Sequence, residues 1–405
     1  FSERSLLRSF PRSERIALTT LFFTFGFFVM ALAPRFPDLK ANLDVTYGTF
    51  GTLVGFGTFG AFLSLMTMGH FIHKIGTFPV LFSSVAAMIV CLLVISNTHS
   101  PVVFFVANFI FGMSWSSYHI SVNTQTMHRQ KEFGTNVIPF LHGMWTLGAV
   151  LSALVATLIA NDVSLAWHMN TMGAIVGLIM LVTILKIKAL CIPARDVRDE
   201  DGAIGFLEMI KSFRIDWILS GAYLSVLMVE ITVGDWSTLF TRDILEQEKG
   251  VAIVPYLVFM TAMIIGRLGY HRVMKGRDEV SVVRSFIVTG GFFFTALVGL
   301  SALLSTVNST LAFFALLAAF FAGGLGSSFL GPYLFSFAAK RSPRPDSVAL
   351  AELSATNTAL TFVTKLLLAW VAQVAGLAFA LLIPGLAFFL VAFYIKAVMK
   401  SPAKS

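Results

Sequence analysis

Apolar residues in this chain form long, nearly uninterrupted runs that short polar segments separate. A transmembrane helix needs about 20 predominantly apolar residues. Twelve runs approach or exceed this length, at 16–34, 49–71, 78–97, 102–127, 138–160, 166–186, 216–239, 250–270, 284–304, 309–337, 347–372 and 376–398. The pattern therefore predicts an all-α integral membrane protein with twelve transmembrane helices.

Composition supports the same fold class and excludes a soluble one. Hydrophobic residues make up 57% of the 405 positions and charged residues only 12%, whereas soluble domains carry about 25% charged residues. Cys91 and Cys191 provide no disulfide framework, and no metal-ligand spacing occurs. The first run resembles a signal peptide that ends at Ala33, but Pro34 disfavours cleavage, so we expect the run to be retained as the first helix.

The basic residues predict the orientation of the chain. Of the 29 Lys and Arg residues, 24 fall in tails and loops expected on one side, and one, Lys365, lies inside a span. The opposite side has only four: Arg35, Lys40, Arg242 and Lys249. Basic loops stay in the cytoplasm, so we expect both termini there, in a plasma (inner) membrane protein. The net charge of +8 then reflects topology, and no nucleic acid partner is expected.

One long polar interruption divides the chain into two parts. Residues 195–202 are expected to form a solvated linker, and 206–211 a short amphipathic helix on the membrane surface. We therefore predict a six-helix bundle at 1–185, a cytoplasmic linker at 186–215 and a second six-helix bundle at 216–405. The halves look related, because the glycines and Ser-Ser pairs of 112–118 and 323–329 coincide at one offset.

The connection between the second and third runs carries a motif. It contains Gly69, His73, Lys74 and Gly76, and it resembles the signature loop between helices two and three of the major facilitator superfamily. His73 stands where that signature has Asp, and the trailing basic pair is missing. The resemblance implies a major facilitator fold of two pseudo-symmetric six-helix bundles, with a substrate site between them near mid-membrane.

A partial echo of this loop lies in the second half, at 266–272. There, too, a histidine precedes a basic residue at the end of an apolar run. We expect His73, His271 and Arg272, with Gly69, Lys74 and Gly76, to form a cytoplasmic gate, and we assign His142 to the same inner face.

The fourth run carries a polar stripe on one helical face, because its members are three or four residues apart. They are Asn108, Gly112, Trp115, His119 and Asn123. One interpretation is a helix-packing face. The other is a substrate-binding face, which the superfamily resemblance favours because it implies that helices one, four, seven and ten line the cavity. An Asn, an aromatic ring and a His suit a polar ring such as a sugar.

The seventh run presents Tyr223 and Glu230 on one face and continues into Asp235 and Trp236. This run and residues 33–40 resemble the fucose-permease-like (YbjJ-type) branch of the superfamily. The resemblance makes Tyr223, Glu230 and Trp236 candidate substrate-binding residues. The acidic coupling residues that the fucose permease has in its first and fourth helices are absent here, which leaves both proton coupling and fucose open.

Two charges lie deep in apolar runs. Glu230 is expected roughly 21 Å and Lys365 roughly 25 Å from the inner ends of their helices, and isolated charges at such depth usually pair. We therefore expect Glu230 and Lys365 to interact, with Asp235 as a third member of the charge cluster. The cluster is either structural or a coupling switch. Asp38, Asp44, Glu246 and Glu248 are expected to be solvated rim charges.

The sequence contains no phosphate-binding loop, metal cluster or nucleophile–base arrangement, so we expect no enzyme, no catalytic residue and no cofactor. The main hypothesis is a secondary transporter, a monomeric permease in lipid that moves a small polar organic solute by alternating access. A proton is a candidate coupling ion, as in a symporter. One alternative is an exporter of amphiphilic or drug-like compounds, although 143–148 lacks the Gly-Pro pair common in antiporters. Another is a non-transporting membrane receptor or assembly factor on the same fold.

Overall fold

The computed structural model describes residues 11–133, 137–194, 213–328, 330–341 and 346–399. Within these ranges, twelve helical segments are long and apolar enough to cross a membrane. The twelve-helix prediction is therefore confirmed. The predicted amphipathic helix at 206–211 lies outside the described residues.

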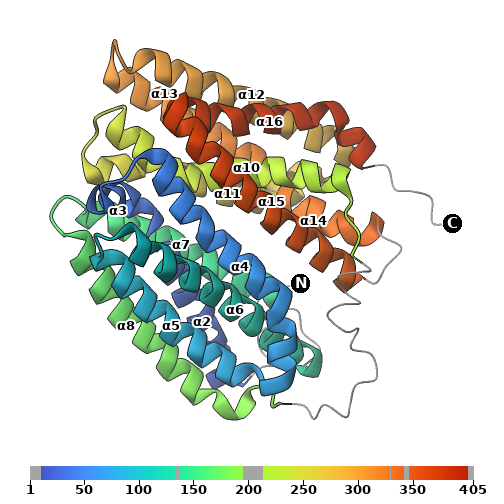
Figure 1. Cartoon of the computed structure of the whole chain (residues 1–405). Helices are drawn as coiled ribbons and strands as arrows, with labels where there is room; N and C mark the ends of the chain where they lie inside the picture. The colour runs from blue at the N-terminus through green and yellow to red at the C-terminus, as the bar shows by residue number, and fades with distance from the viewer. Residues whose placement is uncertain (1–10, 134–136, 195–212, 329, 342–345, 400–405) are drawn as a thin grey trace. The chain divides into compact units, whose positions relative to one another are not determined.

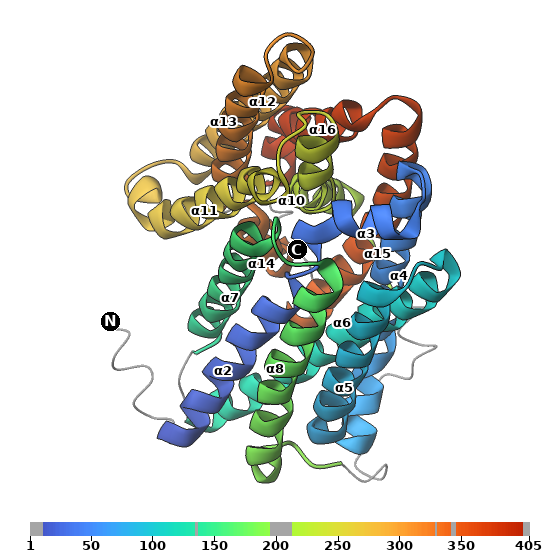
Figure 2. The same ribbon diagram turned by 90° about the vertical axis from the view of Figure 1, so that its left-hand side faces the viewer.

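The chain divides into two compact units, which Figures 1 and 2 show as ribbons. Unit 1 comprises Phe1–Asp44 and Phe56–Gly205, and unit 2 comprises Val45–Gly55 and Phe206–Ser405. The predicted bundles at 1–185 and 216–405 differ from these units at Val45–Gly55, which packs with the second half of the chain. A single helix, α4 (Tyr47–Ile75), therefore begins in unit 2 and continues into unit 1.

Among the described residues, unit 1 contains the remainder of α4 and eight further helical elements. They are α2 (Arg12–Val29), η1 (Ala33–Arg35), α3 (Phe36–Leu43), α5 (Thr77–Asn97), α6 (Pro101–Phe133), α7 (Ile138–Ile159), α8 (Leu165–Lys186) and η2 (Lys188–Leu190). Helix α2 packs on α7 and α8, and α5 packs on α6 and α8. The first span extends beyond the predicted end at 34 because Pro34 and Pro37 occupy first-turn positions of η1 and α3, where a missing N–H is tolerated.

The predicted loop at 69–76 is mostly helix. Helix α4 continues to Ile75, and Gly76 alone separates it from α5. Gly76 has φ +82 and ψ 173, a region that is essentially restricted to glycine. The echo at 266–272 likewise belongs to a helix, and the positive φ occurs later, at Gly276. Glycines near the ends of both helices, Gly69 in α4 and Gly266 and Gly269 in α11, lie inside the helix and not in the turn, which explains why the loop boundaries were wrong.

Where the structure describes it, unit 2 contains the first turns of α4 and seven further helices. They are α10 (Trp217–Asp243), α11 (Lys249–Met274), α12 (Glu279–Leu304), α13 (Ser309–Ser327), α14 (Leu330–Arg341), α15 (Asp346–Val374) and α16 (Leu377–Val398). Asp216, Asp278 and Asn308 accept hydrogen bonds from backbone N–H groups at the starts of α10, α12 and α13, as helix N-caps do. The single span predicted at 309–337 is two helices, which separate at Ser328.

Candidate solute-binding site and membrane-embedded charges

The part of the α6 polar stripe nearer the start of the helix packs against α4. A Cβ atom on Gly112 would overlap the carbonyl group of Gly57, and one on Gly57 would lie 2.8 Å from the Asn108 amide nitrogen. Asn108 is buried. Glycines that face each other allow this close backbone approach. The structure therefore gives Asn108 and Gly112 a helix-packing role, although both share a face with the residues below.

The part of the stripe nearer the end of α6 packs with aromatic rings of α2 and with α7. Trp115, His119 and Asn123 are partly exposed. The His119 ring stacks on Phe25 with centroids 6.0 Å apart, and the Trp115 ring lies 6.4 Å from His119. His142 of α7 meets the His119 ring edge-on at 6.0 Å. We call Trp115, His119, Asn123 and His142 the imidazole cluster.

Asn123 connects the two histidines of the imidazole cluster. Its Nδ2 donates to the backbone carbonyl of His119 at 2.8 Å, and its Oδ1 lies 3.1 Å from Nε2 of His142. His142 also contacts Phe22 edge-on, with centroids 5.5 Å apart. The sequence placed His142 with the inner gate, and the structure brings it into this cluster instead. Its assignment depends on the packing of α7 on α2, which a single sequence does not reveal.

The deep charges pair differently from the prediction. Lys365 Nζ lies 2.8 Å from Oδ2 and 3.1 Å from Oδ1 of Asp235, and each side chain is 15% exposed. No described residue forms an ion pair with Glu230, so the expected Glu230–Lys365 pair is wrong. Helix α15 begins at Asp346 and α10 at Trp217, so Lys365 and Asp235 are both about 27–29 Å along their helices. Glu230 is about five residues short of that depth.

Glu230 belongs to a second polar group in unit 2. It is partly exposed, and its carboxyl lies close enough to Arg267 of α11 for electrostatic interaction. The charges of Glu230 and Arg267 both interact electrostatically with the Tyr223 hydroxyl. Arg267 Nε also donates to the Ser328 carbonyl at 2.9 Å, where α13 ends. Arg267 was not among the residues predicted for the site.

Trp236 is buried rather than open. It is 3% exposed, and a Cβ on Gly51 of α4 would lie 2.8 Å from its ring. Tyr47 contacts the same ring edge-on and donates a hydrogen bond of 2.6 Å to Asp243. In this structure, Trp236 anchors the first turns of α4 within unit 2. Its predicted contact with substrate stays a prediction.

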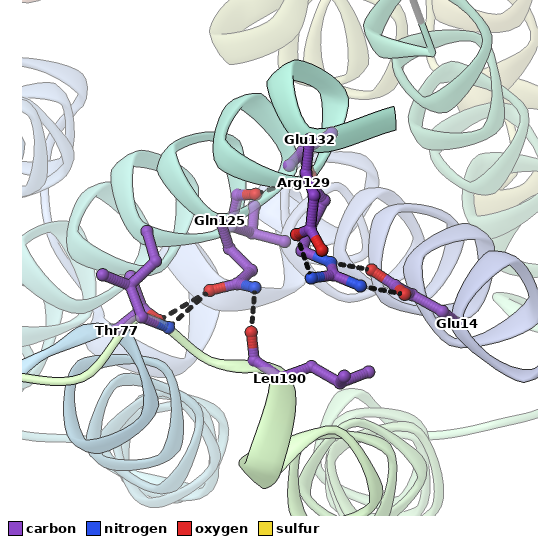
Figure 3. Close-up of polar contacts among 9 residues, drawn as sticks. Glu14, Thr77, Gln125, Arg129, Glu132 and Leu190 are labelled. Atoms are coloured by element: carbon purple, nitrogen blue, oxygen red, sulfur yellow. Dashed lines mark hydrogen bonds and ion pairs between the residues drawn. The ribbon is translucent and has the colours of Figure 1, made fainter. Parts of the chain in front are cut away.

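The start of the linker is fixed to α5 and α6 by polar contacts (Figure 3). Gln125 Nε2 donates to the Leu190 carbonyl at 2.7 Å, and its Oε1 accepts from Thr77 Oγ1 at 2.8 Å and from the Ile192 N–H at 3.0 Å. The Thr77 N–H donates to the Ile192 carbonyl at 3.0 Å. Burial raises the pKa of the adjacent Cys191 thiol.

A second set of contacts in Figure 3 ties α2 to α6. Arg129 forms a forked ion pair with buried Glu14, in which Nη2 lies 2.8 Å from Oε2, and it also pairs with Glu132. The predicted gate residues do not form a comparable network among described residues. Lys74 and Arg272 are exposed, Gly76 is buried under Ile192, and the His271 side chain lies outside the described residues. The gate assignment stays a prediction.

Asp38 is not a solvated rim charge, because it pairs with the buried Arg35. Arg35 is 1% exposed and pairs with Asp38 at 2.7 Å. Its guanidinium also donates to the Val163 carbonyl at 2.9 Å and lies 3.4 Å from Nδ1 of His168. These contacts fix the end of the first span to the start of α8. The rim prediction was wrong here because η1 turns the chain back onto unit 1.

Within the described residues, no group of three or more His, Cys, Asp or Glu side chains could hold a metal ion.

Comparisons with known proteins agree on one family. The family model described as Major Facilitator Superfamily matches residues 18–351. An uncharacterized MFS-type transporter of Yersinia pestis is 25% identical over 375 residues, which cover 91% of each chain. Membrane protein MosC of Rhizobium meliloti is 24% identical over 376 residues, which cover 91% of this chain and 87% of that protein.

Solved structures of low sequence identity share the fold. The nucleoside transporter NupG has a TM-score of 0.71 at 13% identity, over 96% of this chain and 99% of that chain. A D-xylose-proton symporter has a TM-score of 0.70 at 13% identity, over 96% and 98%.

Proposed function

Because the chain belongs to the major facilitator superfamily, a family of membrane transporters and not of enzymes, we propose that this secondary transporter moves a small polar organic solute. A sugar-like ring compound is the favoured substrate, and alternating access is the proposed mechanism. The imidazole cluster carries this proposal.

The cluster offers what a polar ring needs for binding. The partly exposed Trp115 provides an aromatic face, and His119, Asn123 and His142 provide donors and acceptors beside it. Binding sites for small molecules are apolar cavities with a few placed polar groups, and Phe22 and Phe25 supply the apolar wall. Both structural neighbours have substrates, nucleosides and D-xylose, that contain a polar ring, which agrees with this choice.

The coupling ion and the branch belong to the same proposal. A proton is the proposed coupling ion, and unit 2 supplies Glu230 and the Asp235–Lys365 pair as groups that a bound solute or proton would rearrange. Motifs at 33–40 and 230–243 support the fucose-permease-like branch. We also propose an inner-membrane location with both termini in the cytoplasm. Cysteine accessibility labelling at positions 2 and 199 tests this orientation, and labelling from outside intact cells would contradict it.

A thermal-shift screen of the purified protein tests the substrate proposal. The panel consists of monosaccharides, nucleosides, organic acids and amphiphiles, since a ligand that binds the folded state raises the melting temperature with its concentration. We expect a monosaccharide or nucleoside to stabilise the wild type, and Trp115→Ala and His119→Ala to abolish the effect. Trp167→Ala is the matched control, because Trp167 is exposed at the start of α8.

The same screen separates the alternatives. Stabilisation by amphiphiles alone would favour an exporter of such compounds. Unchanged stabilisation in both Trp115→Ala and His119→Ala would show that the imidazole cluster is helix packing and would overturn the assigned site.

A further inference from the structure

The ionisable side chains of unit 1 differ in whether a counter-charge satisfies them. Glu14 pairs with Arg129, and Arg35 pairs with Asp38. His119 and His142 form no ion pair with any described residue, although both lie in membrane-spanning helices. Two adjacent imidazoles without a carboxylate are poorly explained as structural elements, because aliphatic side chains would fill the same space without a polar penalty.

The hydrogen-bond pattern assigns the proton on His142. Asn123 Nδ2 must be the atom that faces the His119 carbonyl, since only the amide NH₂ can donate to it. Oδ1 therefore faces His142 and can only accept, so Nε2 of His142 carries a hydrogen. This bond is the same in neutral and protonated imidazole. His142 can thus gain a proton on Nδ1 without breaking its bond to Asn123.

The distance between the rings limits the pair to one proton over a wide pH range. Two like charges about 6 Å apart disfavour each other, and coupled groups of this kind lose their protons in separate steps. Other titratable groups near the pair have hydrogen-bond or ion-pair partners of their own. The Tyr118 hydroxyl donates to the Leu21 carbonyl, and Glu14 and Arg129 on the packed helices α2 and α6 hold each other. Helix α7 adds no second titratable side chain.

We propose that His119 and His142 form a proton-binding pair that takes up a single proton beside the solute. Histidine changes charge near neutral pH, so the pair supplies a coupling group in the first half of the chain, where carboxylates are absent from the site. The proposal deepens the solute site described above and rests on it for the role in coupling. Proton binding itself requires no solute.

Trp115 reports the protonation of the pair, because a protonated imidazole quenches the fluorescence of a nearby indole. The emission of Trp115 is obtained as the difference between the wild type and Trp115→Phe during an acid titration of the purified full chain. In the wild type the two imidazoles share the first proton. Quenching of Trp115 should therefore occur in two steps whose midpoints are about one to two pH units apart. The Gln side chain in His142→Gln keeps an N–H donor for Asn123 but takes up no proton. Quenching of Trp115 in this variant should therefore occur in one step of full amplitude.

The control is His128→Gln, an exposed position on the same helix, which should titrate like the wild type. His119→Gln should abolish the quenching, and it serves as the second variant if His142→Gln does not fold. Identical titrations of wild type and His142→Gln would overturn the pair. Quenching that persists in His119→Gln would place the protonated group elsewhere and would also overturn it.

Proteoliposomes with an internal pH dye test the coupling role. Each monosaccharide and nucleoside of the panel is added outside. A panel member that stabilises the wild type should acidify the lumen as it enters. His142→Gln should lower the acidification per labelled solute taken up, whatever the change in affinity. An unchanged ratio of acidification to uptake in His142→Gln would contradict the coupling role. If no panel member stabilises the wild type, the proposed function fails, while the fluorescence result still decides the proton-binding pair.

Discussion

The Asp235–Lys365 pair offers a sharp test of the structure. Lys365→Met removes a cation whose Nζ lies within 3.1 Å of both Asp235 oxygens, and Asp235→Asn removes the matching anion. At these distances the attraction is about 5–6 kcal/mol at an effective dielectric constant near 20. Desolvation offsets much of it, so the net effect is smaller than the attraction.

Each single substitution leaves one charge unpaired in a largely buried setting, which typically costs about 3–5 kcal/mol of unfolding free energy. Because each side chain keeps 15% of its exposure, we expect the lower end, about 3 kcal/mol. The double variant removes both charges, and it should recover to within about 1 kcal/mol of the wild type.

The free energy of unfolding is measured by titration with dodecyl sulfate in detergent micelles, followed by circular dichroism. Glu230→Gln is the matched control on the same helix, because Glu230 interacts with Arg267 and Lys365 pairs with Asp235; its effect on stability should add to that of Lys365→Met. Additive destabilisation in the Asp235→Asn/Lys365→Met double variant would refute the pairing.

Three further substitutions test the packing of unit 1. Gly112→Ala should lower the unfolding free energy by at least about 1–3 kcal/mol, because its Cβ would overlap Gly57, whereas Gly143→Ala, with no neighbour within 4 Å, should not. Gly76→Ala should lower the unfolding free energy by about 1–3 kcal/mol because of the positive φ at this position. Gly69→Ala, inside α4, should be neutral or stabilising. Equal effects at both glycines would contradict the helix boundary. Gln125→Leu should lower the unfolding free energy by about 1–3 kcal/mol and increase proteolysis at the linker. Thr124→Val, which removes a hydroxyl that bonds only within α6, should do neither. An unchanged cleavage rate in Gln125→Leu would argue that Gln125 does not fix the start of the linker.

The twelve spans could be predicted because each depends on local composition. An apolar run of about 20 residues has few stable alternatives to a membrane helix, and the same reasoning located α10 and α15 well. It did not place their charges correctly. Glu230 and Asp235 are five residues apart on α10, so a depth estimate accurate to about one turn could not tell which of them pairs with Lys365.

Features of the site that depend on neighbouring helices could not be predicted from the sequence. Spacing put Asn108 and Asn123 on one face of α6, but α4 covers the first and leaves the second beside His142. Helical periodicity identifies a face and not what covers it. Likewise, Gly76 and Gly69 look equivalent in the motif, and only the backbone angles show which of them is the turn.

Counterflow in proteoliposomes shows whether this protein carries a solute across a membrane. Vesicles loaded with unlabelled D-xylose or uridine, or with another solute that stabilises the protein, receive the same labelled compound outside. The account predicts a transient accumulation of label by the wild type, reduced by about tenfold in Trp115→Ala because an aromatic binding face is lost, and unchanged in Trp167→Ala. Uptake no faster than in protein-free vesicles, for every solute that binds, would contradict the claim that this protein is a transporter.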